Sequence, residues 1–137
     1  MKRILFTICI FIIASLSVFA NGGAESAESD VYTIALIAPQ TGDNAQYGNA
    51  YVTGLTVLCN EVNSSGGING KELAFEVFDD ASDAAQSTNI AQMVTSDPKY
   101  IAAIGSYTST SALAMAPLFD EAGMPLLGGE TAEMPGV

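Results

Sequence analysis

Hydrophobic residues gather in four short runs, which predict strands at residues 32–38, 71–78, 100–105 and 124–127. The first run is almost entirely apolar, which is typical of a strand covered on both faces at the centre of a parallel sheet. In the second run Leu73, Phe75 and Val77 alternate with charged or small residues, the pattern of a strand with one face in water. We therefore expect the second strand at an edge of the sheet.

Between these runs the apolar spacing predicts three helices, at residues 45–63, at 83–95, and from the polar residues after Gly105 to Ala122. In the first helix the expected buried face consists of Tyr51, Leu55, Leu58, Cys59 and Val62. In the second helix the residues expected to share a face are Gln86, Ser87, Ile90, Met93 and Val94. Glycines mark the ends of the first and third helices.

Strands that alternate with helices predict an α/β fold with a parallel, doubly wound sheet. Because the second strand belongs outside the first, the expected strand order is 2-1-3-4. The order then reverses between the first and third strands, where ligands bind in such sheets. Residues 41–47 and 106–111 follow these two strands and are expected to flank the ligand.

Six consecutive residues with hydroxyl groups, 106–111, lie where the third strand turns into its helix. The first N–H groups of a helix lack internal partners and carry the positive end of its dipole, so they favour a carboxylate or phosphate. The alternative is local, with Thr108 or Ser109 simply capping the helix. The sequence leaves both open, but the length of the run favours a binding site.

Asp79 and Asp80 are adjacent carboxylates at the end of the second strand. They suggest a metal site, an acid/base pair, or, as part of residues 79–82, side chains that cap the next helix. With no third ligand in view, capping is the preferred interpretation.

The first twenty residues have the pattern of an export signal. Lys2 and Arg3 precede an uncharged apolar run at 4–19, and cleavage is expected after Ala20. An uncleaved membrane anchor is the alternative, although the run is short for a membrane span. Residues 21–30 are small, polar and acidic and are expected to form a flexible linker.

Without this leader the chain keeps two basic and fifteen acidic residues, a net charge of −13, and has no arginine. This charge excludes nucleic acid and anionic lipid as partners. The chain has no histidine, which argues against zinc and triad chemistry, and no nucleophile has a base beside it, so we expect neither an enzyme nor a cofactor. Cys59 is expected to be a small buried hydrophobe.

Residues 32–133 carry a series of motifs in a fixed order: Gln46-Tyr47-Gly48, Asn63 with Gly66-Gly67-Ile68, Gly70-Lys71-x-Leu73, Asp79-Asp80, Ile104-Gly105 followed by hydroxyls, Ala116-Pro117, and Glu121-Ala122-Gly123-Met124-Pro125. This series resembles the branched-chain amino-acid-binding (leucine/isoleucine/valine-binding protein-like) family of type I periplasmic solute-binding proteins, the capture subunits of ABC importers. The resemblance implies a two-lobed protein that closes on its ligand without catalysis. Since such proteins are much longer, residues 31–137 are expected to be the N-terminal part of the first lobe.

The resemblance also implies roles for single residues. Ser109, supported by Thr110, holds the position of the hydroxyl that binds the ligand carboxylate, and Tyr47 that of the residue reaching the ligand from the first loop. In the loop after the fourth strand, Glu130 stands where a small residue presents its carbonyl to the ligand ammonium. A threonine normally follows, but ungapped alignment places Ala132 there, next to the candidate Thr131.

Some relatives join the second-strand corner to the hydroxyl loop by a disulfide. Ser82 and Thr108 occupy those two positions here, so that disulfide is absent.

The function expected from this resemblance is capture of an amino acid of the branched-chain type, or a similar small polar solute, outside the cytoplasm. The expected partners are the ligand and an ABC permease in the membrane, and the full-length protein is expected to be a monomer. The alternative is the ligand-binding part of a membrane sensor or receptor.

Overall fold

The computed structural model describes residues 31–128. The predicted signal peptide and linker, as well as Glu130 and Thr131, lie outside the described residues. The elements in chain order are β1 (Val31–Ile37), α2 (Ala45–Ser64), β2 (Glu72–Phe78), α3 (Ala84–Ser96), β3 (Tyr100–Gly105), α4 (Ser109–Ala122) and β4 (Leu126–Leu127). All strand pairs are parallel and their order is β2-β1-β3-β4, which confirms the predicted fold and the edge position of β2.

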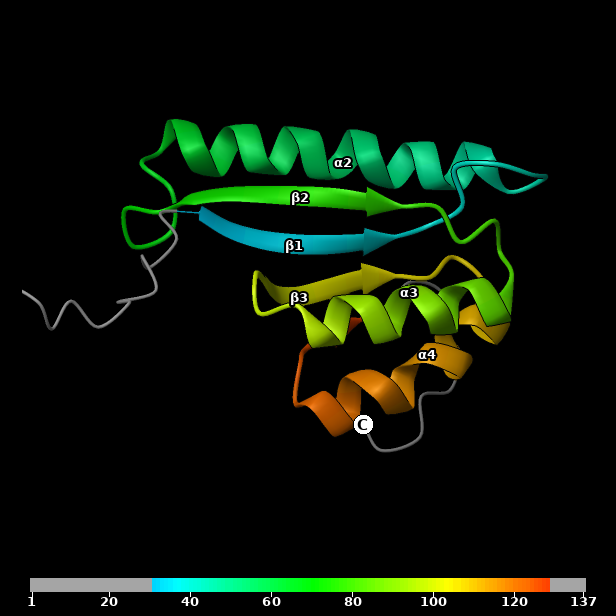
Figure 1. Cartoon of the computed structure of the whole chain (residues 1–137). Coiled ribbons are helices and arrows are strands. Elements are labelled where there is room, and N and C mark those ends of the chain that lie inside the picture. The colour runs from blue at the N-terminus through cyan, green and yellow to red at the C-terminus, as the bar shows by residue number, and fades with distance from the viewer. Residues whose placement is uncertain (1–30, 129–137) are drawn as a thin grey trace, which may run out of the picture.

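The sheet separates two layers of helices, with α2 on one face and α3 and α4 on the other (Figure 1). Successive residues of β1 point to opposite faces and supply both layers. Ala35 and Ile37 pack into the cluster under α3 and α4, where Met115 and Phe119 are fully buried. Leu36 instead packs under α2. This two-sided burial explains why β1 is apolar at almost every position.

Three apolar residues expected on buried faces are in fact exposed, namely Leu58 at 46%, Met93 at 50% and, on β2, Val77 at 36%. Each residue advances a helix by about 100°, so Leu58 points well away from the buried Cys59 on the same helix. On α3 the buried stripe runs through Ser87, Ala91 and Val94, and Met93 lies outside it. The small Ala91 occupies the centre of that face, although the sequence-based prediction assigned the face to its larger neighbours.

Cys59 is buried, as predicted, and burial raises the pKa of its thiol. Within residues 31–128 no helix has the length and apolarity needed to cross a membrane.

The helix ends show which polar residues act as caps. Asp83 begins α3, and its carboxylate accepts the N–H of Gln86 at 2.8 Å. The prediction that residues 79–82 would supply this cap is therefore wrong. A capping side chain has to stand immediately before the first helical turn, whereas Ala81 and Ser82 form a corner with left-handed backbone, at φ of 48° and 60°. Gly123 ends α4 in the left-handed conformation, as predicted.

Two glycines allow close backbone contacts at the carboxyl end of β1. A Cβ atom on Gly48, in the first turns of α2, would overlap the carbonyl oxygen of Pro39. A Cβ atom on Gly105, which has φ of 135°, would overlap the carbonyl oxygen of Ile37. The start of α2 and the end of β3 therefore both lie directly against the end of β1, which brings the two following loops together.

Candidate functional site

The two loops predicted to flank a ligand do lie beside each other at the carboxyl ends of β1 and β3. Tyr47, in the first turn of α2, stacks on Tyr107, in the loop between β3 and α4, with ring centroids 4.2 Å apart and planes 8° from parallel. Tyr47 is 41% exposed and Tyr107 is half-buried. The stacked pair therefore lies at the point where the strand order reverses, the position at which ligands bind in such sheets.

The N-terminus of α4 opens at the same end of the sheet. Thr108 is the cap, and its hydroxyl accepts the N–H of Ser111 at 3.4 Å. Ser109 and Thr110 are the first two residues of the helix, and both are exposed. Their N–H groups have no carbonyl one turn earlier in the helix to receive them. Of the two sequence-based alternatives, capping thus belongs to Thr108, which leaves the Ser109 hydroxyl available to a ligand.

The hydroxyl of Ser111, one turn into α4, is fully buried and has no hydrogen-bond partner among the described residues. The hydroxyl run is thus divided by position into a buried part, Ser106 and Ser111, and an exposed part, Ser109 and Thr110.

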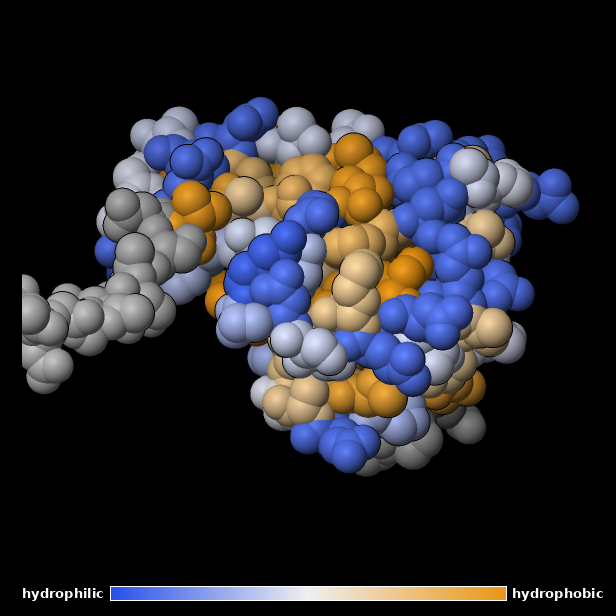
Figure 2. All heavy atoms as spheres, in the orientation of Figure 1, coloured by the Kyte–Doolittle hydropathy of each residue, from blue (hydrophilic) through white to orange (hydrophobic). Residues whose placement is uncertain are grey.

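Charge is distributed unevenly between the two edges of the sheet. Within residues 31–128 the basic residues are Lys71 and Lys99, and they directly precede β2 and β3 at the amino edge. At the carboxyl edge the loops instead carry acids, namely Asp43, Asp79, Asp80 and Asp83. Figure 2 shows that hydrophilic residues predominate at the end where the strand arrows of Figure 1 terminate. A bound anion would therefore depend on helix N–H groups and hydroxyls rather than on a basic side chain.

Asp79 and Asp80 accept hydrogen bonds from protein groups. Burial raises the pKa of the Asp79 carboxyl, but the hydroxyl of Thr41 and three backbone N–H groups donate to it and hold its pKa below the ordinary value. Among residues 31–128, no three His, Cys, Asp or Glu side chains are grouped so that they could hold a metal ion. The two carboxylates thus organise the loops, a role that neither capping nor metal binding describes.

The corner after β2 is joined to the hydroxyl loop by a hydrogen bond from the Ser106 hydroxyl to the Asp80 carboxylate. This contact joins the two segments that contain Ser82 and Thr108, and it does so without cysteine.

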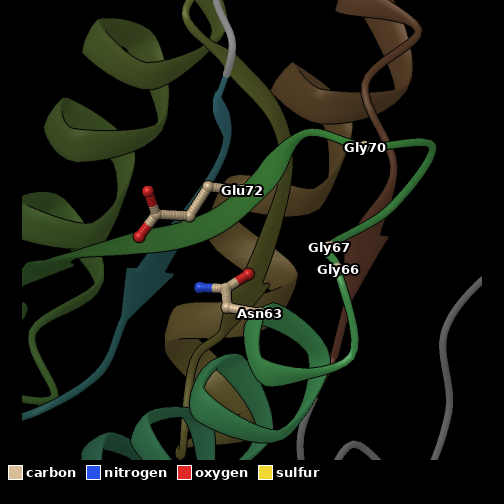
Figure 3. A pocket seen from close by; sticks show the side chains of 5 residues that line it. All are labelled: Asn63, Gly66, Gly67, Gly70 and Glu72. Atoms are coloured by element: carbon tan, nitrogen blue, oxygen red, sulfur yellow. The ribbon is translucent and has the colours of Figure 1, made fainter.

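A separate surface hollow of about 270 Å³ lies at the opposite, amino edge (Figure 3). Its lining consists of Asn63, Gly66, Gly67, Gly70 and Glu72. The Asn63 amide is already engaged, since it donates to the carbonyl of Leu73 and accepts its N–H, both at 2.8 Å. The hollow is thus a turn between α2 and β2 whose one amide side chain holds the backbone together, and we do not regard it as a ligand site.

The structure brings Tyr47, Ser109 and Thr110 to one edge of the sheet, as predicted, while Glu130 and Thr131 lie outside the described residues. Sequence reasoning missed two features of this edge. Tyr107 was counted as one hydroxyl among six, although its ring forms the stack. Asp80 was considered as a cap or metal ligand, although it is fully buried and holds a loop. The available signal for the role of Asp80 was a carboxylate after β2 together with a run of hydroxyl residues after β3, which lies two strands away in the sheet.

A sequence profile of the periplasmic binding protein family matches residues 31–136. The chain belongs to the periplasmic binding protein family. An amino acid binding protein of Pseudomonas aeruginosa is 33% identical over 124 residues, which are 90% of this chain and 32% of the relative. The leucine-, isoleucine-, valine-, threonine- and alanine-binding protein of the same organism is 30% identical over 109 residues, which are 79% of this chain and 29% of the relative.

Among solved structures, the branched-chain amino acid transporter substrate-binding protein LivJ of Streptococcus pneumoniae, in complex with isoleucine, superimposes with a TM-score of 0.69 at 27% identity. The match covers 77% of this chain and 30% of LivJ. This chain therefore spans about a third of the length of the family members it matches.

Proposed function

We propose that this chain is the N-terminal part of the first lobe of an extracytoplasmic solute-binding protein. The complete protein captures an amino acid of the branched-chain type for an ABC permease and catalyses no reaction. Family membership supports solute binding, and the amino acid ligands named for relatives support the ligand class.

One observation of this structure carries the proposal. The exposed N-terminus of α4, with Ser109 and Thr110 in its first turn, opens beside the Tyr47–Tyr107 stack at the strand-order reversal. The helix start suits a carboxylate, because its N–H groups point outward and its dipole favours negative charge. The two rings supply apolar surface next to it.

The charges around this position favour a zwitterion over a simple anion. The described carboxyl edge carries acids and no basic side chain, so it attracts an ammonium group and repels a net negative ligand. In this proposal the ligand carboxylate binds at Ser109, Thr110 and the helix N–H groups. The ammonium faces Glu130, with Thr131 beside it.

Calorimetric titration of the full-length protein with matched ligands tests this assignment. Isoleucine carries both charged groups, N-acetylisoleucine lacks the ammonium, and isoleucinamide lacks the carboxylate. Each altered ligand should bind at least about tenfold more weakly, because a charge-assisted hydrogen bond contributes about 1.5–3 kcal/mol. Equal binding of isoleucine and N-acetylisoleucine, or tighter binding of inorganic phosphate, would contradict the proposal.

The same titration applied to Glu130→Gln tests the ammonium partner. Isoleucine binding should weaken by about 1–3 kcal/mol while the melting temperature of the ligand-free protein stays the same. An unchanged affinity would place Glu130 outside the binding site.

We further propose that the protein is exported and that its leader is cleaved after Ala20. Mass spectrometry of the mature protein from its native envelope should then give a chain that starts at Asn21. A chain that retains Met1 and stays in the membrane fraction would instead favour an uncleaved anchor.

A further inference from the structure

Asp79, at the end of β2, fastens the loop between β1 and α2. Its carboxylate accepts the N–H of Gln40 at 2.8 Å, the N–H of Thr41 at 3.3 Å and the hydroxyl of Thr41 at 2.6 Å. It also accepts the N–H of Ala81 at 2.9 Å, which fixes its own corner. Asp79 therefore ties the loop that leads to Tyr47 to the corner after β2. Asn44 of that loop adds a hydrogen bond from its side-chain N–H to the hydroxyl of Ser82 at 3.0 Å.

Asp80 fastens the loop between β3 and α4. It is fully buried, and one carboxylate oxygen accepts the hydroxyl of Ser106. The same oxygen lies 3.0 Å from the hydroxyl of Ser87 on α3, whose proton is shared with the carbonyl of Asp83 at 2.8 Å. The second oxygen of Asp80 accepts the N–H of Ser82 at 3.0 Å. Ser106 directly precedes Tyr107, so the Asp80 carboxylate holds the segment that begins the hydroxyl run.

Adjacent residues in extended chain point to opposite sides, which explains how one corner reaches two loops. Asp79 contacts the loop after β1, and β1 is the strand next to β2 in the sheet. Asp80 contacts the loop after β3, which is the next strand beyond β1. We propose that Asp79 and Asp80 are a positioning pair that sets the separation of the two ligand-binding loops. This inference rests on the proposed function, and neither aspartate is assigned a contact with the ligand.

The groups that donate to Asp79 and Asp80 are N–H groups and hydroxyls. A hydroxyl can also accept, so asparagine at either position could keep these contacts by donating its NH₂ group to Thr41 or to Ser106. Alanine offers no polar atom, so Asp79→Ala and Asp80→Ala are the variants that release the loops.

The decisive comparison uses the two hydroxyls that donate to Asp80. Ser106→Ala releases the hydroxyl loop, whereas Ser87→Ala removes a hydrogen bond to the same carboxylate from α3 and leaves the loop attached. In the full-length protein, Ser106→Ala and Asp80→Ala should weaken isoleucine binding about tenfold, because the groups that contact the ligand are then no longer held in place. Ser87→Ala should change the affinity less than about twofold. Equal losses for Ser87→Ala and Ser106→Ala would overturn the assignment of Asp80.

Asp79 has its own matched variant. Thr41→Val removes the hydroxyl that donates to Asp79 and keeps the shape of the side chain. It should weaken isoleucine binding, but less than Asp79→Ala does, because the N–H groups of Gln40 and Thr41 still donate to Asp79. Wild-type affinity in both variants would remove Asp79 from the pair.

Amide hydrogen exchange of the ligand-free full-length protein gives a readout that does not depend on binding. Asp80→Ala and Ser106→Ala should speed exchange at residues 106–111 and leave Leu73, at the opposite edge, unchanged. Faster exchange at both edges would mean general destabilisation and would overturn the proposal. If wild-type protein binds no amino acid while exchange at 106–111 responds as expected, the proposed function fails and the control of this loop by Asp80 stands.

Discussion

The two edges of the sheet use polar side chains in opposite ways. At the amino edge, Asn63 exchanges two hydrogen bonds with the backbone of Leu73, so the side chain and the backbone satisfy each other. At the carboxyl edge, Asp79 and Asp80 accept hydrogen bonds from groups of the two loops, and the helix start at Ser109 is exposed to solvent.

This difference shows why a hollow is a poor guide to function here. The hollow of about 270 Å³ lies at the amino edge, where the amide is already paired. The carboxyl edge offers unpaired helix N–H groups and two stacked rings. Ligand binding depends on the hydrogen-bond donors that the fold leaves available. The comparison therefore predicts that variants at the amino edge change the stability of the protein and not its affinity for the ligand.

The largest expected effect comes from filling the space where the backbone of α2 lies directly against the segment after β1. Gly48→Ala places a methyl group on the Pro39 carbonyl oxygen, and we expect it to lower the free energy of unfolding by about 3 kcal/mol or more. Gly54→Ala on the same helix meets no atom within 4 Å and should stabilise by about 1 kcal/mol. Chemical denaturation of both variants measures the difference, and similar stabilities would show that the α2–β1 contact is not tight.

At the amino edge, Asn63→Ala should destabilise by about 3 kcal/mol, because the N–H and carbonyl groups of Leu73 each lose a partner. Asn60→Ala, an exposed position one turn earlier, is the control and should have little effect. Thermal melts and isoleucine titrations on both full-length variants check this. A large loss of affinity in folded Asn63→Ala protein would break the proposed separation between the two edges.

At the carboxyl edge the expected effects are reversed. Ser109→Ala should weaken isoleucine binding by about 1.5–3 kcal/mol, the loss of one charge-assisted hydrogen bond, and leave the melt unchanged. Its neighbour Thr108→Ala removes the cap and should lower stability by about 0.5–2 kcal/mol. If Ser109→Ala melts early but binds isoleucine normally, the carboxylate does not lie at Ser109.

The smallest effect concerns acid. The folded pKa of Asp79 is lowered, so its contribution to stability is present above the ordinary aspartate pKa of about 4 and is lost as the pH falls through the lower folded value. The contribution should be below about 1 kcal/mol, because the group is partly exposed to solvent. Melts from pH 6 to about pH 2 should fall less steeply for Asp79→Asn than for wild type, and parallel curves would contradict this sign.

The fold could be predicted because its signals are local. The apolar first strand, the alternating second strand and the glycines after the helices each report on a few neighbouring residues, and together they predict the strand order that the structure has. Hydrophobic spacing also predicted that Leu58 and Met93 are buried, which they are not. Each is a large apolar residue beside a narrow buried stripe, so it has the right spacing but no partner in the core.

The candidate site was only partly predictable because its contacts are distant along the chain. Hydroxyls at a helix start indicated Ser109 and Thr110. The hydrogen bonds from Thr41 to Asp79 and from Ser106 to Asp80 span 38 and 26 residues, and the Tyr47–Tyr107 stack joins different loops. No periodicity within one segment carries that information, since it depends on how the corner after β2 turns.

The joint between this corner and the hydroxyl loop consists of a serine and an aspartate rather than two sulfurs. Such a joint forms when the segments meet, without an oxidant or thiol exchange. Cys59, the one cysteine within residues 31–128, is buried, and its raised pKa keeps the thiol protonated and unreactive. Within residues 31–128 the two loops at the carboxyl edge are therefore held by hydrogen bonds that do not depend on the redox state of the compartment, and a reducing agent should leave these contacts in place.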